Sequence, residues 1–308
     1  MSLVYHAGQL AVQVEANTRR VADMLANWVG PVGTFVNVAD ILVIATADPD
    51  GVLRFACASG PAPLVDVLGD STLLLPSALA ESGIAPGLAG AIAINPAQRR
   101  RARLNGLLSW TEDGLELETH EAFTNCRKYV APSTPLEDGL HVGPVSRREG
   151  SLEDESLLSA LARVETAFLA SISPDGQPDV SHRGGPPGFF TLDAPARRLS
   201  WTEYVGDGML KSAGNIRANG SATLLVIDLE SGDAFELSGR AAYTTLRRNE
   251  RPREDGLERH KEDFPTQGAM TLEIDAVQRL VRLISPRRRV ETAAKITSCS
   301  ELDEQMPQ

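Results

Sequence analysis

Three adjacent side chains, Ser181, His182 and Arg183, are the residues of this chain best suited to hold an anionic ligand. They end a strand-like run, and the segment Gly184–Gly188 that follows contains three glycines and two prolines. Glycine lets the backbone turn sharply and lets a ligand approach it closely. Arginine binds phosphate through paired hydrogen bonds. The pattern indicates a phosphate-binding strand end, although an ordinary strand-to-loop junction with an exposed arginine has the same composition.

A second candidate is the glycine-rich stretch 206–216, which leads into a helix expected at 208–218. Lys211 and Ser212 lie near the start of that helix, and Asn215 follows one turn later. Backbone N–H groups at a helix start attract anions. The stretch therefore favours an anion site, with a capped surface helix as the alternative.

Two further segments carry clustered cations. Arg99, Arg101 and Arg103 alternate along the chain, so in a strand they would share one face. They could line a phosphate pocket or form a solvated edge that blocks strand aggregation. In the segment Phe123–Tyr129, Arg127 and Lys128 stand beside an amide and a ring. They could cover a planar ligand, or they could belong to a helix start or a domain junction. Nothing near Cys126 in the sequence would activate a catalytic thiol.

The chain carries one pattern twice. The turn Asp48–Gly51 corresponds to Ser173–Gly176, and Gly60-Pro61 falls on Gly185-Pro186 at an offset of 125 residues. Repeats at this spacing are whole domains. At the same offset, Ala56-Cys57-Ala58 stands opposite Ser181-His182-Arg183. An offset of 124 places the apolar stretch 86–92 opposite residues 210–216, so the first copy has no counterpart of Lys211, Ser212 and Asn215. Because both polar clusters are kept only in the second copy, we expect them to form a single anion site.

The remaining patterns define the elements that would position this site. Helices are expected at 10–28, with Leu10 and Val14 among the apolar positions, at about 86–93, and at 152–163, capped by Ser151 or Ser156. Strands are expected at 41–47, 52–58, 64–68, 71–75, 103–110, 114–120, 166–173, 178–183, 188–192, 197–202, 221–229, 233–244 and 269–275.

Many short antiparallel strands with few helices predict a mainly β (α+β) fold, a closed or split β-barrel in each half. No glycine-rich dinucleotide fingerprint follows a strand, which disfavours a Rossmann fold. Residues 1–135 and 151–308 are the expected domains, the first with a degenerate site, and residues 136–150 form the linker between them.

The overall composition narrows the class of protein. A net charge of −11 argues against a nucleic-acid partner. Three scattered cysteines and five scattered histidines provide no disulfide framework and no metal-ligand spacing. No signal peptide or membrane-spanning run is visible, so a cytoplasmic protein is expected. Arg287-Arg288-Arg289 is expected to be a solvated basic patch.

Taken together, these segments resemble the FMN-binding split-barrel proteins related to pyridoxamine 5′-phosphate oxidase, in their two-copy form. The resemblance runs from about residue 5 to about residue 245. The segments that carry it are Tyr5–Gln9 with Val12-Gln13, Arg99–Gly106, Asn125–Tyr129, Ser181–Phe190, Gly214–Ile216, Ile227-Asp228 and Leu237–Ala241.

The resemblance implies tandem barrels that form a pseudo-dimer within one chain, with FMN held between them. It assigns phosphate contacts to Ser181 and Arg183, and it places Lys211, Ser212 and Asn215 nearby. Arg127 and Lys128 of the other half would close the site. Among the side chains near it, His182 is the one candidate general acid or base, and it is expected instead to orient the phosphate or to pack.

The chain departs from the family pattern at several positions. Gln9 stands where the family usually has an acid, and Arg127 replaces a proline. Asp207 and Lys211 stand where asparagine is common, and Asn219-Gly220 replaces Asn-Pro. An additional lysine suits a phosphate, but the changes leave the identity of the bound nucleotide open.

The leading functional hypothesis is an FMN-dependent oxidoreductase that exchanges a hydride or electrons with a small-molecule substrate. A non-catalytic flavin-binding or electron-transfer module served by a separate reductase is the alternative. A degenerate barrel that handles haem or binds another protein is a third reading. No nucleic acid or membrane partner is expected, and either a monomer or a homodimer fits the sequence.

Overall fold

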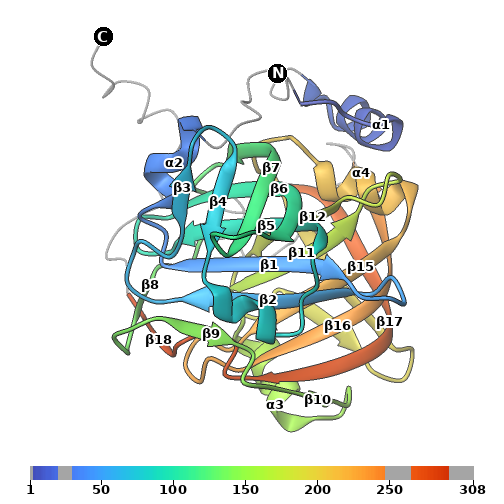
Figure 1. Cartoon of the computed structure of the whole chain (residues 1–308). Helices are drawn as coiled ribbons and strands as arrows, with labels where there is room; N and C mark the ends of the chain where they lie inside the picture. The colour runs from blue at the N-terminus through green and yellow to red at the C-terminus, as the bar shows by residue number, and fades with distance from the viewer. Residues whose placement is uncertain (1–2, 20–29, 247–264, 291–308) are drawn as a thin grey trace.

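The computed structural model describes residues 3–19, 30–246 and 265–290. Within them the chain is mainly β and forms two large antiparallel sheets (Figure 1). The first sheet has the strand order β3-β4-β7-β6-β5-β1-β2-β9. Its strands are β1 (Ile41–Ala47), β2 (Leu53–Ser59), β3 (Asp66–Leu68), β4 (Thr72–Leu75), β5 (Gly87–Asn95), β6 (Arg100–Trp110), β7 (Leu115–Thr124) and β9 (His141–Gly143).

The second sheet has the order β12-β11-β15-β16-β17-β14-β13, with β10 beside β17. Its strands are β10 (Ser146–Glu149), β11 (Thr166–Ile172), β12 (Pro178–Gly184), β13 (Phe190–Asp193), β14 (Arg198–Tyr204), β15 (Ser221–Ile227), β16 (Ala234–Thr245) and β17 (Thr266–Val281). A third, two-stranded sheet pairs β8 (Ser133–Pro135) with β18 (Arg287–Arg289).

The two large sheets share one strand order. Reading β3-β4-β7-β6-β5-β1-β2 against β13-β14-β17-β16-β15-β11-β12 matches the strands one by one in chain order. The pairing register agrees as well, because β6 and β16 are interrupted at equivalent places. The interruption lies between Asn105 and Gly106 in β6 and between Ser238 and Gly239 in β16. At both interruptions only glycine fits, since a Cβ would lie 1.9 Å from the carbonyl oxygen of Glu118 or of Glu273.

Apolar side chains fill three cores. One lies within each large sheet's own half, and the third joins the sheets, where Val43 and Phe55 meet Phe168 and Leu225. Because both faces of β1 and β11 are covered, these strands are continuous apolar runs rather than alternating ones. This shared core brings the edge strand β12 against the first sheet.

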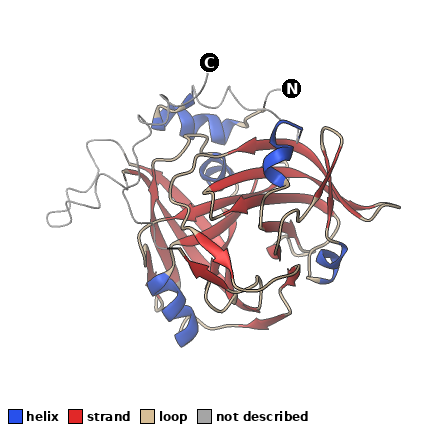
Figure 2. Cartoon of the chain, turned by 90° about the vertical axis from the view of Figure 1, so that its left-hand side faces the viewer, coloured by secondary structure: helices blue, strands red, loops and turns tan. Residues whose placement is uncertain are grey.

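The helices lie around the outside of the strands (Figure 2). They are α1 (Ala7–Ala16), α2 (Gly30–Val36), α3 (Glu155–Arg163) and α4 (Lys211–Ala218), with a short 3₁₀ helix, η2 (Ser77–Glu81). α1 packs on α4 through Gly8 and Gly214, where a Cβ on Gly214 would lie 2.4 Å from the Cα of Gln9. The beginning of the chain therefore supports an element of the second sheet's half.

The expected helix at 10–28 is wrong in its start, its end and its buried face. Helix α1 ends at Ala16, where Asn17 takes a left-handed conformation, and residues 20–28 lie outside the described part. Val14 is 60% exposed, whereas Val12 and the polar Gln13 are fully buried. The apolar spacing failed because two amide side chains, Gln9 and Gln13, are buried there and bind Asn215 of α4 and the carbonyl of Met209 before it.

The helix expected at about 86–93 is instead strand β5. Its alternating residues face two cores, with Ala89, Ala91 and Ala93 in the core of the first sheet and Ile92 and Ile94 in the core between the sheets. In chain order the counterpart of α4 is η2, which lies between β4 and β5 as α4 lies between β14 and β15. The stretch 86–92, which the offset of 124 places opposite α4, is therefore not its structural equivalent. The N-cap of α3 is Asp154, whose side chain accepts the N–H of Ser156, and not the expected Ser151 or Ser156.

The expected solvated patch at 287–289 is wrong for Arg287, which is fully buried. Its guanidinium donates to Asp40 at 2.7 Å and to Ser133, and so ties β18 to the start of the first sheet. Burial raises the pKa of Asp40, and Arg287 only partly offsets this. Arg288 and Arg289 are exposed, and Arg289 pairs with Glu165.

Residues 141–149, within the segment expected to be a linker, contribute β9 to the first sheet and β10 to the second. Among the described helices, none is long and apolar enough to cross a membrane.

The glycine at the shared bulge gives the first prediction. Gly106→Ala forces a Cβ onto the Glu118 carbonyl and is expected to lower the free energy of unfolding by about 2 kcal/mol or more. Gly33→Ala is the control, because its Cβ would meet Val67 at an ordinary 3.5 Å in a helix, and it is expected to change stability by less than about 1 kcal/mol. Urea unfolding measures both, and equal stabilities of the two variants would contradict the bulge argument.

Candidate functional site

A pocket lies where the first sheet meets β12, β14 and the start of α4. The first sheet's side contributes Arg101 and Arg103 of β6 and, after β7, Asn125 and Tyr129. The other lining residues are Ser181, His182, Arg183, Gly184, Phe189, Thr202, Glu203, Tyr204, Gly206, Asp207, Gly208, Leu210, Lys211, Ser212, Ala213 and Gln267. The pocket has an open volume of about 110 Å³.

The N-terminus of α4 opens into this pocket without a side-chain cap. Leu210 occupies the N-cap position with φ 52°, and its apolar side chain accepts no hydrogen bond. The first-turn N–H groups of a helix need acceptors, and the helix dipole makes this end positive. Because Leu210, Lys211, Ser212 and Ala213 all line the pocket, an anion there would meet these groups.

Ser181 and Arg183 of β12 stand next to this helix start. Arg183 donates from Nη1 to Ser181 Oγ at 2.9 Å, and Ser212 Oγ lies 2.7 Å from the same hydroxyl. Arg183 Nε donates to Glu203 Oε1 at 2.7 Å. That carboxylate oxygen also accepts the indole N–H of Trp201 at 2.7 Å, which fixes Glu203 beside the guanidinium.

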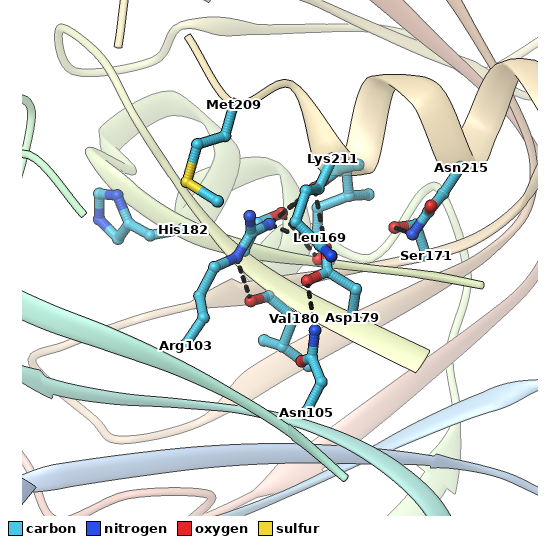
Figure 3. Close-up of polar contacts among 12 residues, drawn as sticks. Arg103, Asn105, Leu169, Ser171, Asp179, Val180, His182, Met209, Lys211 and Asn215 are labelled. Atoms are coloured by element: carbon cyan, nitrogen blue, oxygen red, sulfur yellow. Dashed lines mark hydrogen bonds and ion pairs between the residues drawn. The ribbon is translucent and has the colours of Figure 1, made fainter. Parts of the chain in front are cut away.

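Arg103 crosses from the first sheet to the second (Figure 3). It donates to the carbonyl of Val180 at 3.0 Å, to Asp179 Oδ2 at 2.8 Å and to Ser212 Oγ at 2.9 Å. Asn105 donates to the other carboxylate oxygen of Asp179 at 3.0 Å. Burial alone would raise the pKa of Asp179, but the charge of Arg103, with smaller contributions from its other neighbours, holds that pKa below its ordinary value.

Lys211 is also committed to the first sheet. Its Nζ donates to both carboxylate oxygens of Glu121 on β7 at 2.7 Å, and it lies 5.7 Å from the ring centre of Tyr5 and 5.9 Å from that of Phe123. The ammonium thus joins β7, the N-terminal segment and α4. This joint holds the start of α4 against the pocket.

His182 is buried and neutral. Arg101 Nη1 lies 3.3 Å from His182 Nδ1, and because arginine can only donate, we assign the ring proton to Nε2. Burial, followed by the charges of Arg101 and Arg183, holds the pKa of His182 well below its ordinary value. Nε2 has no hydrogen-bond partner among the described residues.

The structure brings together Ser181, His182, Arg183, Lys211 and Ser212 around the pocket. Asn215 lies elsewhere, because its side chain binds Ser171, Gln9 and His6 at the contact of α4 with α1.

Neither Arg127 nor Lys128 lines the pocket. Arg127 is exposed, and Lys128 contributes its carbonyl oxygen to Arg101. Asn125 and Tyr129 of the same segment take their place. Ligand binding by all of these residues stays a prediction.

Other residues of the site were missed or placed wrongly. Arg99 has φ 53° and belongs to the turn before β6, so only Arg101 and Arg103 share the buried face. Strand alternation alone would have selected these two once the strand start was known. Glu203 and Tyr204 line the pocket from the end of β14, and only their proximity to the Gly206–Ile216 stretch signalled them.

The equivalent position on the other side of the shared core has its charges exchanged. Arg103 lies opposite Ile92, and Glu236 lies opposite Leu225 at the matching place in the second sheet. Arg54 on β2 likewise takes the place of Asp179 on β12. The pair Arg103–Asp179 on one side therefore corresponds to the pair Glu236–Arg54, 3.8 Å apart, on the other.

This counterpart position is filled. Arg147 from β10 binds Glu236 and donates to the carbonyl of Phe55 at 2.8 Å, while Glu236 accepts the N–H of Phe55 at 2.7 Å. Cys57 takes the place of His182, and burial, with the charge of Glu236, raises its pKa well above the ordinary value. No reactive thiolate is therefore expected there.

Among the described residues, no group of three or more His, Cys, Asp and Glu side chains gathers in a way that could hold a metal ion.

No family model and no curated protein matches this sequence. Solved structures of split-barrel proteins related to pyridoxamine 5′-phosphate oxidase do match about two fifths of the chain. HupZ of Group A Streptococcus is 17% identical over 40% of this chain and 90% of its own, with a TM-score of 0.30. An FMN-binding protein of Nostoc punctiforme related to pyridoxamine 5′-phosphate oxidase is 13% identical over 46% and 90%, with a TM-score of 0.30.

General Stress Protein 26 of Bacillus anthracis is 16% identical over 44% of this chain and 97% of its own, with a TM-score of 0.29.

The buried histidine gives a pH prediction. In the folded protein His182 stays neutral, whereas in the unfolded chain it takes up a proton near pH 6.5. The unfolded state then binds more protons below that pH, so the free energy of unfolding falls as the solution becomes more acidic. His182→Gln is expected to remove up to about 1.4 kcal/mol per pH unit from this slope.

Urea unfolding from about pH 7.5 to about pH 5 measures the effect. His120→Gln is the control, because His120 is exposed, and its profile is expected to match the wild type. A His182→Gln profile parallel to that of the wild type would show that the folded protein admits the charged ring.

Proposed function

We propose that this pocket binds FMN and that the chain is an FMN-binding oxidoreductase of the pyridoxamine 5′-phosphate oxidase-like group. The observation that carries the proposal is the uncapped start of α4, which opens beside Ser181 and Arg183. In this account residues 1–135 and 151–308 are two split barrels from an internal duplication, residues 136–150 link them, and the flavin lies between them.

The donors around the pocket fit a phosphate. Backbone N–H groups, the hydroxyls of Ser181 and Ser212 and the guanidinium of Arg183 are the groups that phosphate oxygens accept from. Aromatic side chains line the same pocket and suit a planar ring. Tyr129 and Tyr204 lie with ring centres 5.6 Å apart, and Phe189 lines the pocket with them.

When bound, the flavin supplies hydride or electron transfer. The side chains of this chain bind and orient it. Arg103 and Asp179 hold Ser212 in place, and the Lys211–Glu121 pair holds the start of α4. His182 is not the general acid, because its pKa lies well below the ordinary value and the ring stays neutral.

A non-catalytic electron-transfer module is the second candidate, and the internal pairing of the site favours it. Arg103, Arg183 and Lys211 each contact a carboxylate, so none is poised to transfer a proton. A small-molecule substrate or a separate reductase would then exchange electrons with the flavin. Oxidation of NADPH by the FMN-loaded protein alone would support the oxidoreductase, and electron transfer only from an added reductase would support the module.

One flavin per chain is expected, because the counterpart position is closed by Arg147 and Glu236. Titration of the protein with FMN, followed by flavin fluorescence, is expected to give one site per chain. Arg183→Ala removes a charged donor and leaves Glu203 without its cationic partner beside the ligand, which is expected to weaken FMN binding at least about tenfold.

Arg198→Ala is the matched control, because Arg198 lies on β14 with its side chain 53% exposed, and it should bind FMN as the wild type does. Absence of FMN binding by the wild type contradicts the proposed function. Two sites per chain would contradict the closure of the counterpart position.

A further inference from the structure

The cations of the pocket differ in how their charge is balanced. Arg103 contacts Asp179 at 2.8 Å, Arg183 contacts Glu203 at 2.7 Å and Lys211 contacts Glu121 at 2.7 Å. Within the described part of the chain, Arg101 is the one pocket-lining cation that makes no ion pair with a carboxylate.

The hydrogen bonds of Arg101 go only to neutral groups. Nη1 donates to the carbonyl of Lys128 at 3.1 Å and to His182 Nδ1 at 3.3 Å, and Nη2 lies 3.8 Å from Cys126 Sγ. A guanidinium has five N–H donors, so these contacts do not exhaust it. Arg101 is nevertheless buried, with only 8% of the residue exposed.

Leaving a buried charge without an ionic partner is costly. Burial lowers the pKa of Arg101, Cys126 and Asp207 raise it, and the like charges of Arg103 and Arg183 lower it further. Arginine nevertheless stays protonated in proteins. Arg101 therefore has no carboxylate in contact with it, and Asp207, which lines the same pocket, acts on it only through space.

The counterpart position lacks this charge. Arg101 lies opposite Ile94, and the matching residue of the second sheet is Ala234, opposite Ile227. Ala234 is fully buried. The cation without a contacting carboxylate is thus present only on the side that has the pocket.

We infer that Arg101 neutralises the anionic group of the ligand, so that the charge needed for binding comes from the first sheet and the other donors come from the second. This rests on the proposed function, which it deepens by naming the residue that selects a phosphorylated ligand over its dephosphorylated form. The competing explanation is a positioning role, in which Arg101 only anchors the segment that carries Lys128.

The test compares FMN with riboflavin, which lacks the phosphate. Arg101→Met is expected to weaken FMN binding at least about tenfold while riboflavin binding changes by less than about twofold. Arg101→Lys keeps the charge and should retain most of the preference for FMN. Arg100→Met is the control, because Arg100 is exposed on the same strand, and it should behave as the wild type does.

An equal loss of FMN and riboflavin affinity in Arg101→Met would overturn the inference in favour of the positioning role. Unchanged FMN binding would overturn it as well. Inorganic phosphate separates failure of this inference from failure of the proposed function.

Phosphate is expected to raise the melting temperature of the wild type but not of Arg101→Met. If it does so while FMN fails to bind, the proposed function fails and the role of Arg101 stands. If the wild type responds to neither ligand, both are contradicted.

Discussion

Packing of the two sheets on a shared core makes a charged group that enters their interface costly unless it finds a partner there. Arg103 and Asp179 meet this requirement on one side of the shared core, where both are nearly fully buried. Removing one member of such a buried pair costs about 3–5 kcal/mol. Because Arg103 also binds Ser212, the interaction that joins the sheets sets the position of the helix start that faces the pocket.

The same requirement explains why two sheets of equal strand order carry different sites. On the opposite side the charges are exchanged, with Glu236 in place of Arg103 and Arg54 in place of Asp179. A glutamate can accept the Phe55 N–H, and Arg147 then satisfies the Phe55 carbonyl from β10. The exchange closes that position with protein groups, whereas the arginine-rich side keeps a pocket.

Much of this fold follows from the sequence, since turns such as Asp48–Gly51 and apolar runs such as 41–47 predict the strands at nearly their observed bounds. Segments of small residues were harder to assign to a helix or a strand. The alanines of β5 suit a helix as well as a strand, and their two-faced burial is decided by neighbours far away in the chain. Helix α1 was misjudged for a related reason, because polar Gln9 and Gln13 face α4.

The residues of the site also differ in whether the sequence signals them. Ser181, Arg183, Lys211 and Ser212 were recognisable because they cluster locally with glycine. The carboxylates that bind these cations, such as Glu121 and Glu203, come from other strands and gave no local signal. Arg287 is the opposite case, where a run of like charges suggested solvent and only long-range pairing with Asp40 explains its burial.

A crystal structure of the protein grown with FMN tests the central claim most directly. The account predicts one flavin per chain, with its phosphate at the start of α4 between Arg183 and Arg101 and its ring beside Tyr129 and Tyr204. Flavin bound at the Glu236 side, flavin with its phosphate directed away from α4, or an empty pocket at saturating FMN would contradict it.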